Sequence, residues 1–147
     1  MHSSSVFPGN LVEVNCIDLS SQGYGISRLE NIVIFTPNLL PSEKAIVKCL
    51  FLKNKSLWFS ELISILYESD QRIQNKCSHF YTCGSCSLQH LSYQSQLDFK
   101  CSSFKETLLR IGSIELNKEA LSIISADPFK YRTKAIIPFQ FGDNNDY

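Results

Sequence analysis

The sequence predicts a β-rich amino-terminal domain, a five-stranded barrel, followed by an α+β segment with one long helix. Three observations indicate this fold class. Short β-branched runs alternate with turn residues between positions 11 and 66, three cysteines then crowd into ten positions, and an apolar stripe at helical spacing follows them. The chain has 147 residues, and its hydrophobic fraction of 44% is enough for a core.

The strands are predicted from apolar alternation and from the turns between them. The first covers 11–17 and places Val12, Val14 and Cys16 on one face. The next two join at Glu30-Asn31, where asparagine tolerates the left-handed backbone of a tight hairpin. The four strands after the first are expected at 25–29, 32–36, 45–52 and 56 to about 65. Five short strands in roughly 55 residues fit a closed barrel of the oligonucleotide-binding size.

One convincing helix is predicted after the cysteines, with Gly112 as its carboxy-terminal stop. Its stripe consists of Tyr93, Leu97, Cys101, Phe104, Leu108 and Ile111. A polar stretch at 68–76 separates the barrel from the cysteines, and a new strand is expected from Tyr131 to Phe141. We therefore expect a barrel at 1–68, a cysteine and helix segment at 69–115, and the start of a truncated central domain at 116–147.

Charge and composition limit the classes of function. Lys and Arg together number 14, and Asp and Glu also number 14, so no bulk positive field would attract nucleic acid. RNA binding would therefore have to come from local patches. The first residues do not resemble a secretory signal, and the most apolar run is too short to span a bilayer. These features favour a cytoplasmic protein without a membrane partner, in which cysteines bind metals or fill the core.

The strongest chemical signal is the run from Cys77 through Cys83 to Cys86. Three thiolates at spacings of six and three can surround a soft metal centre, and Gly84 gives the backbone freedom to bring two of them together. The spacing alone favours an iron–sulfur cluster and a zinc ion equally, and a non-metal role is the third alternative.

Either metal needs a fourth ligand. Cys101 lies within the helical stripe, where a small buried hydrophobic residue is expected. His79 or His90 could complete a zinc site. Otherwise the fourth ligand would lie beyond Tyr147.

Cations form two groups that are candidate RNA contacts, together with Arg28. In the second group the cations alternate with Tyr131 and Thr133, an arrangement that suits phosphate contact and base stacking. Solvated strand faces look the same, and we favour that interpretation for the first group. The two groups are Lys44, Lys48, Lys53 and Lys55, and Lys130, Arg132 and Lys134.

Several segments together resemble one family, the RNA (uracil-5-)-methyltransferases that carry a TRAM domain and an iron–sulfur cluster. The best-known members act on 23S ribosomal RNA. The resemblance spans nearly the whole chain, with its motifs in order. The matching segments are 18–29, the loop 40–43, the cysteine run with its continuation at 77–97, Lys100, and 131–135.

The resemblance implies a TRAM barrel that contacts RNA and a [4Fe-4S] cluster with Cys77, Cys83 and Cys86 as three ligands. The fourth ligand of the family is a cysteine well downstream, past the end of this chain. Two positions depart from the family pattern, because Ser42 and Ser85 stand where glycine is usual.

Family members use S-adenosylmethionine, a catalytic cysteine and a general base, all in a carboxy-terminal domain that this chain does not match. Cys16, Cys49 and Cys101 lie in apolar patterns and are not expected to be nucleophiles. We therefore expect no catalytic residue and no activity from the chain alone, with a separate chain as one possible source of the catalytic domain. The alternative is a stand-alone RNA-binding TRAM protein with a zinc or structural metal site and no catalysis.

Overall fold

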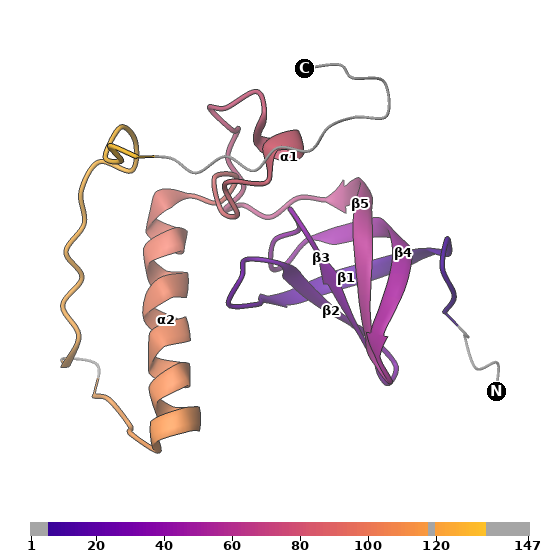
Figure 1. The fold of residues 1–147 in the computed structure, drawn as a ribbon, viewed down its shortest axis with the longest axis horizontal. Coiled ribbons are helices and arrows are strands. Elements are labelled where there is room, and N and C mark those ends of the chain that lie inside the picture. The colour runs from indigo at the N-terminus through magenta and orange to yellow at the C-terminus, as the bar shows by residue number, and fades with distance from the viewer. Residues whose placement is uncertain (1–5, 118–119, 135–147) are drawn as a thin grey trace.

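The structure, a computed structural model, describes residues 6–117 and 120–134. Five strands form a closed barrel, and a cysteine-rich loop and a long helix follow it (Figure 1). Around the barrel the order is β1-β2-β3-β5-β4, with β3 and β5 parallel and the other neighbours antiparallel. The strands are β1 (Leu11–Leu19), β2 (Gly25–Leu29), β3 (Ile32–Thr36), β4 (Lys44–Asn54) and β5 (Leu57–Tyr67). The predicted five-stranded barrel is confirmed.

The interior of the barrel is filled by alternate side chains from its strands. Cys16 and Cys49 belong to this core, as their apolar patterns predicted, and Val12 packs against it partly buried. The buried members are Val14, Cys16, Ile34, Leu39, Ala45, Val47, Cys49 and Trp58. Strand β4 pairs with β5 from Lys44↔Tyr67 to Asn54↔Leu57, and this long pairing extends both strands beyond their predicted ends.

One turn residue differs from the prediction, and a close contact explains one glycine. The left-handed residue between β2 and β3 is Glu30, with φ of 52°, and not Asn31. Gly25 is needed at the start of β2, because an added Cβ would lie 2.6 Å from the carbonyl oxygen of Leu39. This close approach brings the 37–43 loop against the start of β2.

A second, smaller core joins the barrel to the segment that follows it. Leu19 and Leu40 of the barrel side pack with Leu91 from the cysteine segment, and Leu88 and Phe99 cover them. Gly23 lies in the same joint, because an added Cβ would lie 2.9 Å from the Cβ of Ser87. The β1–β2 turn and the cysteine segment are therefore in direct contact.

The two helices are α1 (Phe80–Cys83) and α2 (Tyr93–Gly112). Ser92 begins α2, where its hydroxyl accepts a hydrogen bond from the Ser95 amide. Gly112 lies inside the helix, and the left-handed capping residue is Ser113 with φ of 53°, which corrects the predicted stop. In Figure 1 the barrel and α2 lie side by side, and the loop between them carries α1.

The predicted stripe of α2 is not a buried face. Ile111 is 76% exposed, Phe104 is 49% exposed, and Cys101 is only half-buried. The helix contacts the second core through Phe99, which was not part of the stripe. Helical periodicity located the helix, but no stripe residue is fully buried, and only Tyr93, Leu97, Cys101 and Leu108 are half-buried. No helix among the described residues has the length and apolar character needed to cross a membrane.

The strand expected from Tyr131 is not present at residues 131–134, which have no regular secondary structure. The remainder of that predicted strand, through Phe141, lies outside the described residues. The backbone at Lys130, directly before the predicted strand, is left-handed, with φ of 59°.

Candidate nucleic-acid interface and the cysteine loop

The three cysteines of the predicted metal site lie on the exposed loop around α1. Cys77 precedes the helix, Cys83 ends it, and Cys86 follows the left-handed Gly84. All three are free thiols. The thiol of Cys83 donates a hydrogen bond to the Ser85 hydroxyl over 3.1 Å, and contacts with Ser85 lower the pKa of Cys83.

These thiols do not form a ready-made metal centre. In residues 6–117 and 120–134, no three side chains of His, Cys, Asp or Glu come close enough together to hold a metal ion. The donors have the softness that iron–sulfur clusters and zinc require, but their positions on the loop do not converge. The iron–sulfur cluster therefore remains a prediction from the motif and the resemblance.

The histidines considered for a zinc site lie in different environments. His90 is fully buried, its ring centroid lies 5.1 Å from that of Phe80, and neither ring nitrogen has a hydrogen-bond partner. Burial and the nearby Arg72 lower the pKa of His90 to about 4, and Glu43 opposes the shift. His79 is exposed at the start of α1. His90 therefore serves as a neutral packing residue in this arrangement.

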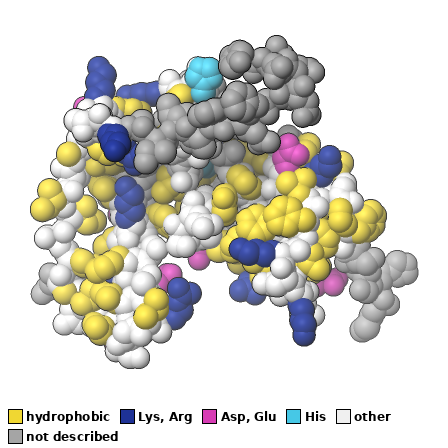
Figure 2. Space-filling model, in the orientation of Figure 1, with side chains coloured by type: hydrophobic (Ala, Val, Ile, Leu, Met, Phe, Trp, Pro, Cys, Tyr) yellow, Lys and Arg dark blue, Asp and Glu magenta, His cyan; other side chains and the backbone are white. Residues whose placement is uncertain are grey.

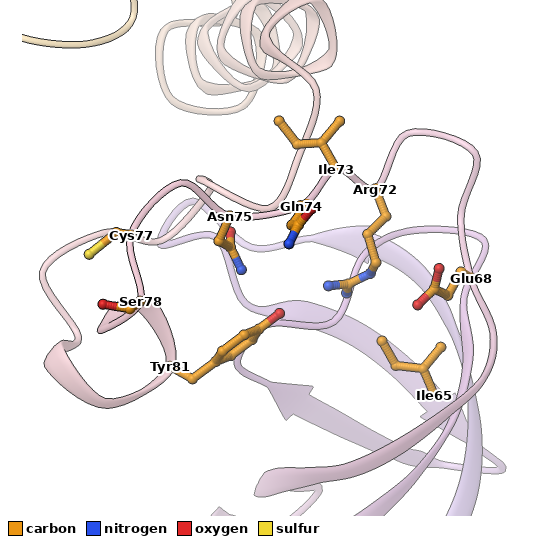
Figure 3. Close-up of a pocket in the computed structure, with 9 residues that line it drawn as sticks. All are labelled: Ile65, Glu68, Arg72, Ile73, Gln74, Asn75, Cys77, Ser78 and Tyr81. Atoms are coloured by element: carbon orange, nitrogen blue, oxygen red, sulfur yellow. The ribbon is translucent and has the colours of Figure 1, made fainter.

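A cavity of about 490 Å³ lies between the end of β5 and the cysteine loop (Figure 3). Figure 3 shows Arg72 between Glu68 and the Gln74–Asn75 side, with the Tyr81 hydroxyl directed toward it. Cys77 lies at the far end with its sulfur turned away. The Arg72 guanidinium bonds the carboxylate of Glu43 through two nitrogens, so the cation of this cavity is held in a buried ion pair.

A second cavity, also about 490 Å³ and called the basic cavity below, has the character of an anion-binding site. It lies between the cysteine loop, the first turns of α2 and the segment 128–132. Lys100, Lys130 and Arg132 line it, and none of the described residues around it is a carboxylate. Its aromatic residues are Tyr93, Phe129 and Tyr131. Cations beside aromatic rings, without acids, suit phosphate contact and base stacking.

The other predicted RNA contacts lie in different environments and outside the basic cavity. Lys44 forms a half-exposed ion pair with Glu13, at 2.8 Å, so a carboxylate competes with phosphate for its ammonium group. The ammonium of Lys53 lies 5.5 Å from the centroid of the Phe59 ring. Four remaining cations are exposed at separate places and do not line the basic cavity: Arg28, Lys48, Lys55 and Lys134.

Neither buried cysteine of the barrel is a nucleophile. Burial raises the pKa of Cys16 to about 12 and also raises the pKa of Cys49. A thiol held protonated and away from solvent reacts slowly, because the thiolate is the reactive form. The structure thus agrees with the sequence in assigning these two residues to the core.

Comparison with known proteins then gives the family context. No protein-family model matches the sequence. A protein named as an uncharacterized RNA methyltransferase from Listeria monocytogenes is 36% identical over 142 residues, which are 96% of this chain and 31% of that protein. Proteins with the same designation from Parasynechococcus marenigrum and Halalkalibacterium halodurans are 34% and 33% identical over 97% and 88% of the chain. By sequence, nearly the whole chain is similar to a part of each of these proteins.

The chain spans about a third of the length of the relatives it matches, with shares of 31%, 30% and 28% in the three named here. The barrel agrees with the TRAM domain that the resemblance implied. The sequence predicted Arg132 in a strand with Lys130 directly before it, and it indicated Lys100 only through the family resemblance. In the sequence, each of these three cations is next to an aromatic residue, and that pattern could have marked them as one site. Their proximity in space, however, depends on the path of the chain, which brings 128–132 back to α2.

Proposed function

We propose that this chain is the amino-terminal, RNA-contacting part of an RNA methyltransferase. The observation that carries the proposal is the match of nearly the whole chain to about a third of relatives with that designation. The matched part has a barrel of the oligonucleotide-binding size and a cavity lined by cations and aromatic rings. These features are suited to holding RNA.

In its finer form, the proposal is that the complete enzyme methylates carbon 5 of uracil with S-adenosylmethionine, as the family resemblance implies. This chemistry needs a cysteine thiolate that adds to the adjacent ring carbon and activates carbon 5. Cys16 and Cys49 are buried and have raised pKa values, so neither can supply that thiolate. The nucleophile would lie in another part of the enzyme, on the same or a separate chain, with ribosomal RNA as the substrate.

We also propose that Cys77, Cys83 and Cys86 are cluster ligands, in a loop arrangement other than the one described. Their exposure and the open space around Gly84 leave room for the loop to rearrange. Anaerobic purification followed by iron, sulfide and zinc analysis tests this part. Iron and sulfide with a broad visible band support the cluster. Stoichiometric zinc would support the alternative, a stand-alone RNA-binding module without chemistry.

The test of RNA contact compares charge variants of the 147-residue chain. Lys100→Ala/Arg132→Ala removes two cations of the basic cavity, while Lys44→Ala removes a cation already paired with Glu13. We expect the double variant to weaken binding of a labelled single-stranded RNA at least tenfold and Lys44→Ala to weaken it less than threefold, since an unpaired cation gains more from a phosphate. Equal losses in the two variants would contradict the assignment of the cavity.

A methyl-transfer assay tests whether the chain has catalytic activity by itself. We expect no transfer from labelled S-adenosylmethionine to a uracil-containing RNA by the chain alone. Turnover by the purified chain would overturn that expectation.

A further inference from the structure

We propose that the outer face of the barrel carries an aromatic surface on which unpaired RNA bases stack. The aromatic surface consists of Tyr24, Phe35, Phe51 and Phe59. The inference rests on the proposed function and deepens it, because it names the form of RNA that the chain recognises. It uses none of the cations that define the basic cavity.

Strand register brings three of the four rings into one row. Phe35 of β3 lies opposite Phe59 of β5, and Phe59 lies opposite Phe51 of β4. The rings of Phe51 and Phe59 are stacked, with centroids 5.2 Å apart, while those of Phe35 and Phe59 meet edge-on at 5.7 Å. Tyr24, which precedes β2, adds a fourth ring at 5.9 Å from Phe59. The row therefore crosses three adjacent strands.

The four rings lie on the outer face of the barrel, and part of each ring is exposed to solvent. Side chains alternate along a strand, so Ile34 and Trp58 fill the core while their neighbours Phe35 and Phe59 face outward. Phe51 is 53% exposed, and the other three rings are half-buried. Figure 2 shows hydrophobic side chains gathered over the barrel, with Lys or Arg side chains among them.

The charges around the aromatic surface favour a polyanion over an apolar protein. The ammonium of Lys53 lies beside the Phe59 ring, and Arg28 and Lys55 are exposed on neighbouring parts of the barrel. The nearest acid along β5 is Glu61, and it lies opposite Lys48 of β4. A base can stack on a ring while its phosphate approaches an ammonium group, which is the arrangement single-strand binding surfaces use.

The aromatic surface continues into a cleft between the barrel and α2. Phe35 and Ile26 line one wall of this cleft, Phe99 and Arg110 line the α2 wall, and its volume is about 680 Å³. Asp18 and Glu106 also line it, so phosphate contact would fall on Arg110. An RNA strand that stacks on the four rings can therefore continue into this cleft. A duplex cannot use the row, because paired bases hide their faces within their own stack.

The experiment measures affinity and stacking in the same variants of the 147-residue chain. Phe51→Ala removes the most exposed ring, Phe51→Trp keeps a ring, and Tyr67→Ala removes a 62% exposed ring at the end of the same sheet outside the row. Fluorescence anisotropy with a labelled oligouridylate gives the affinity. An oligonucleotide with one 2-aminopurine reports stacking through quenching of its fluorescence. Circular dichroism confirms that each variant is folded.

We expect Phe51→Ala to weaken single-strand binding about tenfold and to reduce the quenching, since one stacked base is lost. Phe51→Trp should retain both signals, and Tyr67→Ala should change affinity less than twofold. The wild-type chain should prefer the single strand to a duplex of the same length.

Unchanged affinity and quenching in folded Phe51→Ala, or equal affinity for duplex and single strand, would overturn the inference. In that case the proposed function still stands if Lys100→Ala/Arg132→Ala weakens binding. If the wild-type chain binds no RNA, both the inference and the proposed function fail.

Discussion

The guanidinium group of Arg72 holds both carboxylate oxygens of Glu43, a residue 29 positions earlier in the chain. The Arg72 Nε donates to one oxygen at 2.5 Å and Nη2 donates to the other at 2.8 Å. Glu43 also accepts from the amides of Leu40 and Ser69, and Arg72 donates to the carbonyl of Asn38. This buried pair fixes the start of the cysteine segment against the 37–43 loop, so the polar stretch after β5 is attached to the barrel.

Removal of one partner of this pair should be costly, because it leaves the other charge buried and uncompensated. The Arg72 side chain is 9% exposed and that of Glu43 is fully buried. We expect Arg72→Ala to lower the free energy of unfolding by about 3–5 kcal/mol. Lys44→Ala, which breaks the exposed pair with Glu13, should cost at most about 1 kcal/mol. Urea denaturation of both variants checks the difference, and similar losses would contradict it.

Acid should destabilise the fold through His90. Its pKa is about 4 in the folded chain, below the ordinary value of 6.5 that holds when the chain is unfolded, so the unfolded chain binds more protons between these values. The stabilising contribution is complete above pH 6.5 and is lost as the pH falls toward 4. We expect a loss of about 2 kcal/mol between about pH 7.5 and pH 5.

The measurement is urea denaturation at both pH values in the wild type and in two histidine variants. His90→Gln should lose most of this pH dependence, whereas His79→Gln, at an exposed position, should keep it. A wild-type stability that does not change over this range would show that His90 is not held neutral by burial.

Glycine at position 42 should stabilise the loop that carries Glu43. Ser42 has φ of 69°, in the left-handed region that costs a residue with a Cβ about 1 kcal/mol. Its amide donates to the carbonyl oxygen of Cys16, so the conformation is fixed by the barrel. We expect Ser42→Gly to raise the free energy of unfolding by up to about 1 kcal/mol. Ser21→Gly, at an exposed turn residue without positive φ, should lower it slightly, and a loss at Ser42 would contradict the strain argument.

Thiol reactivity should divide the six cysteines by environment. In the metal-free chain, the exposed Cys77, Cys83 and Cys86 should react with a thiol reagent before the buried Cys16 and Cys49. Ser85→Ala should slow the reaction of Cys83, since contacts with Ser85 lower the pKa of that thiol. Mass spectrometry of time-resolved labelling assigns each site. Equal rates for Cys83 in the two chains would show that the Ser85 hydroxyl does not activate it.

The barrel was predictable because its strands obey local rules, alternation along each strand and turn residues between strands. Gly25–Leu29 and Ile32–Thr36 were placed at their observed bounds from these rules alone. The helix was also found from its period, but its buried contact was not. Phe99 reaches Leu19 and Leu40, which are distant in sequence, and periodicity carries no information about such partners.

The candidate sites were less predictable because they depend on contacts between distant segments. The aromatic surface needs the register of β3, β4 and β5, which no local pattern specifies. From the sequence alone, Lys44 was a candidate RNA contact. Its ion pair with Glu13 depends on the pairing of β1 with β4, which no local pattern shows. The cysteine spacing was visible at once, but the described arrangement does not bring the three thiols together.

The salt dependence of RNA binding tests the central claim, that this chain is the RNA-contacting part of its enzyme, most directly. The affinity for a single-stranded RNA should be measured between about 50 and 200 mM salt. Release of counterions by the three cations of the basic cavity predicts a slope of about −2 in a plot of log affinity against log salt, a loss of roughly 15- to 20-fold over that range. Absence of binding at the lowest salt, or an affinity that salt does not change, would contradict the claim.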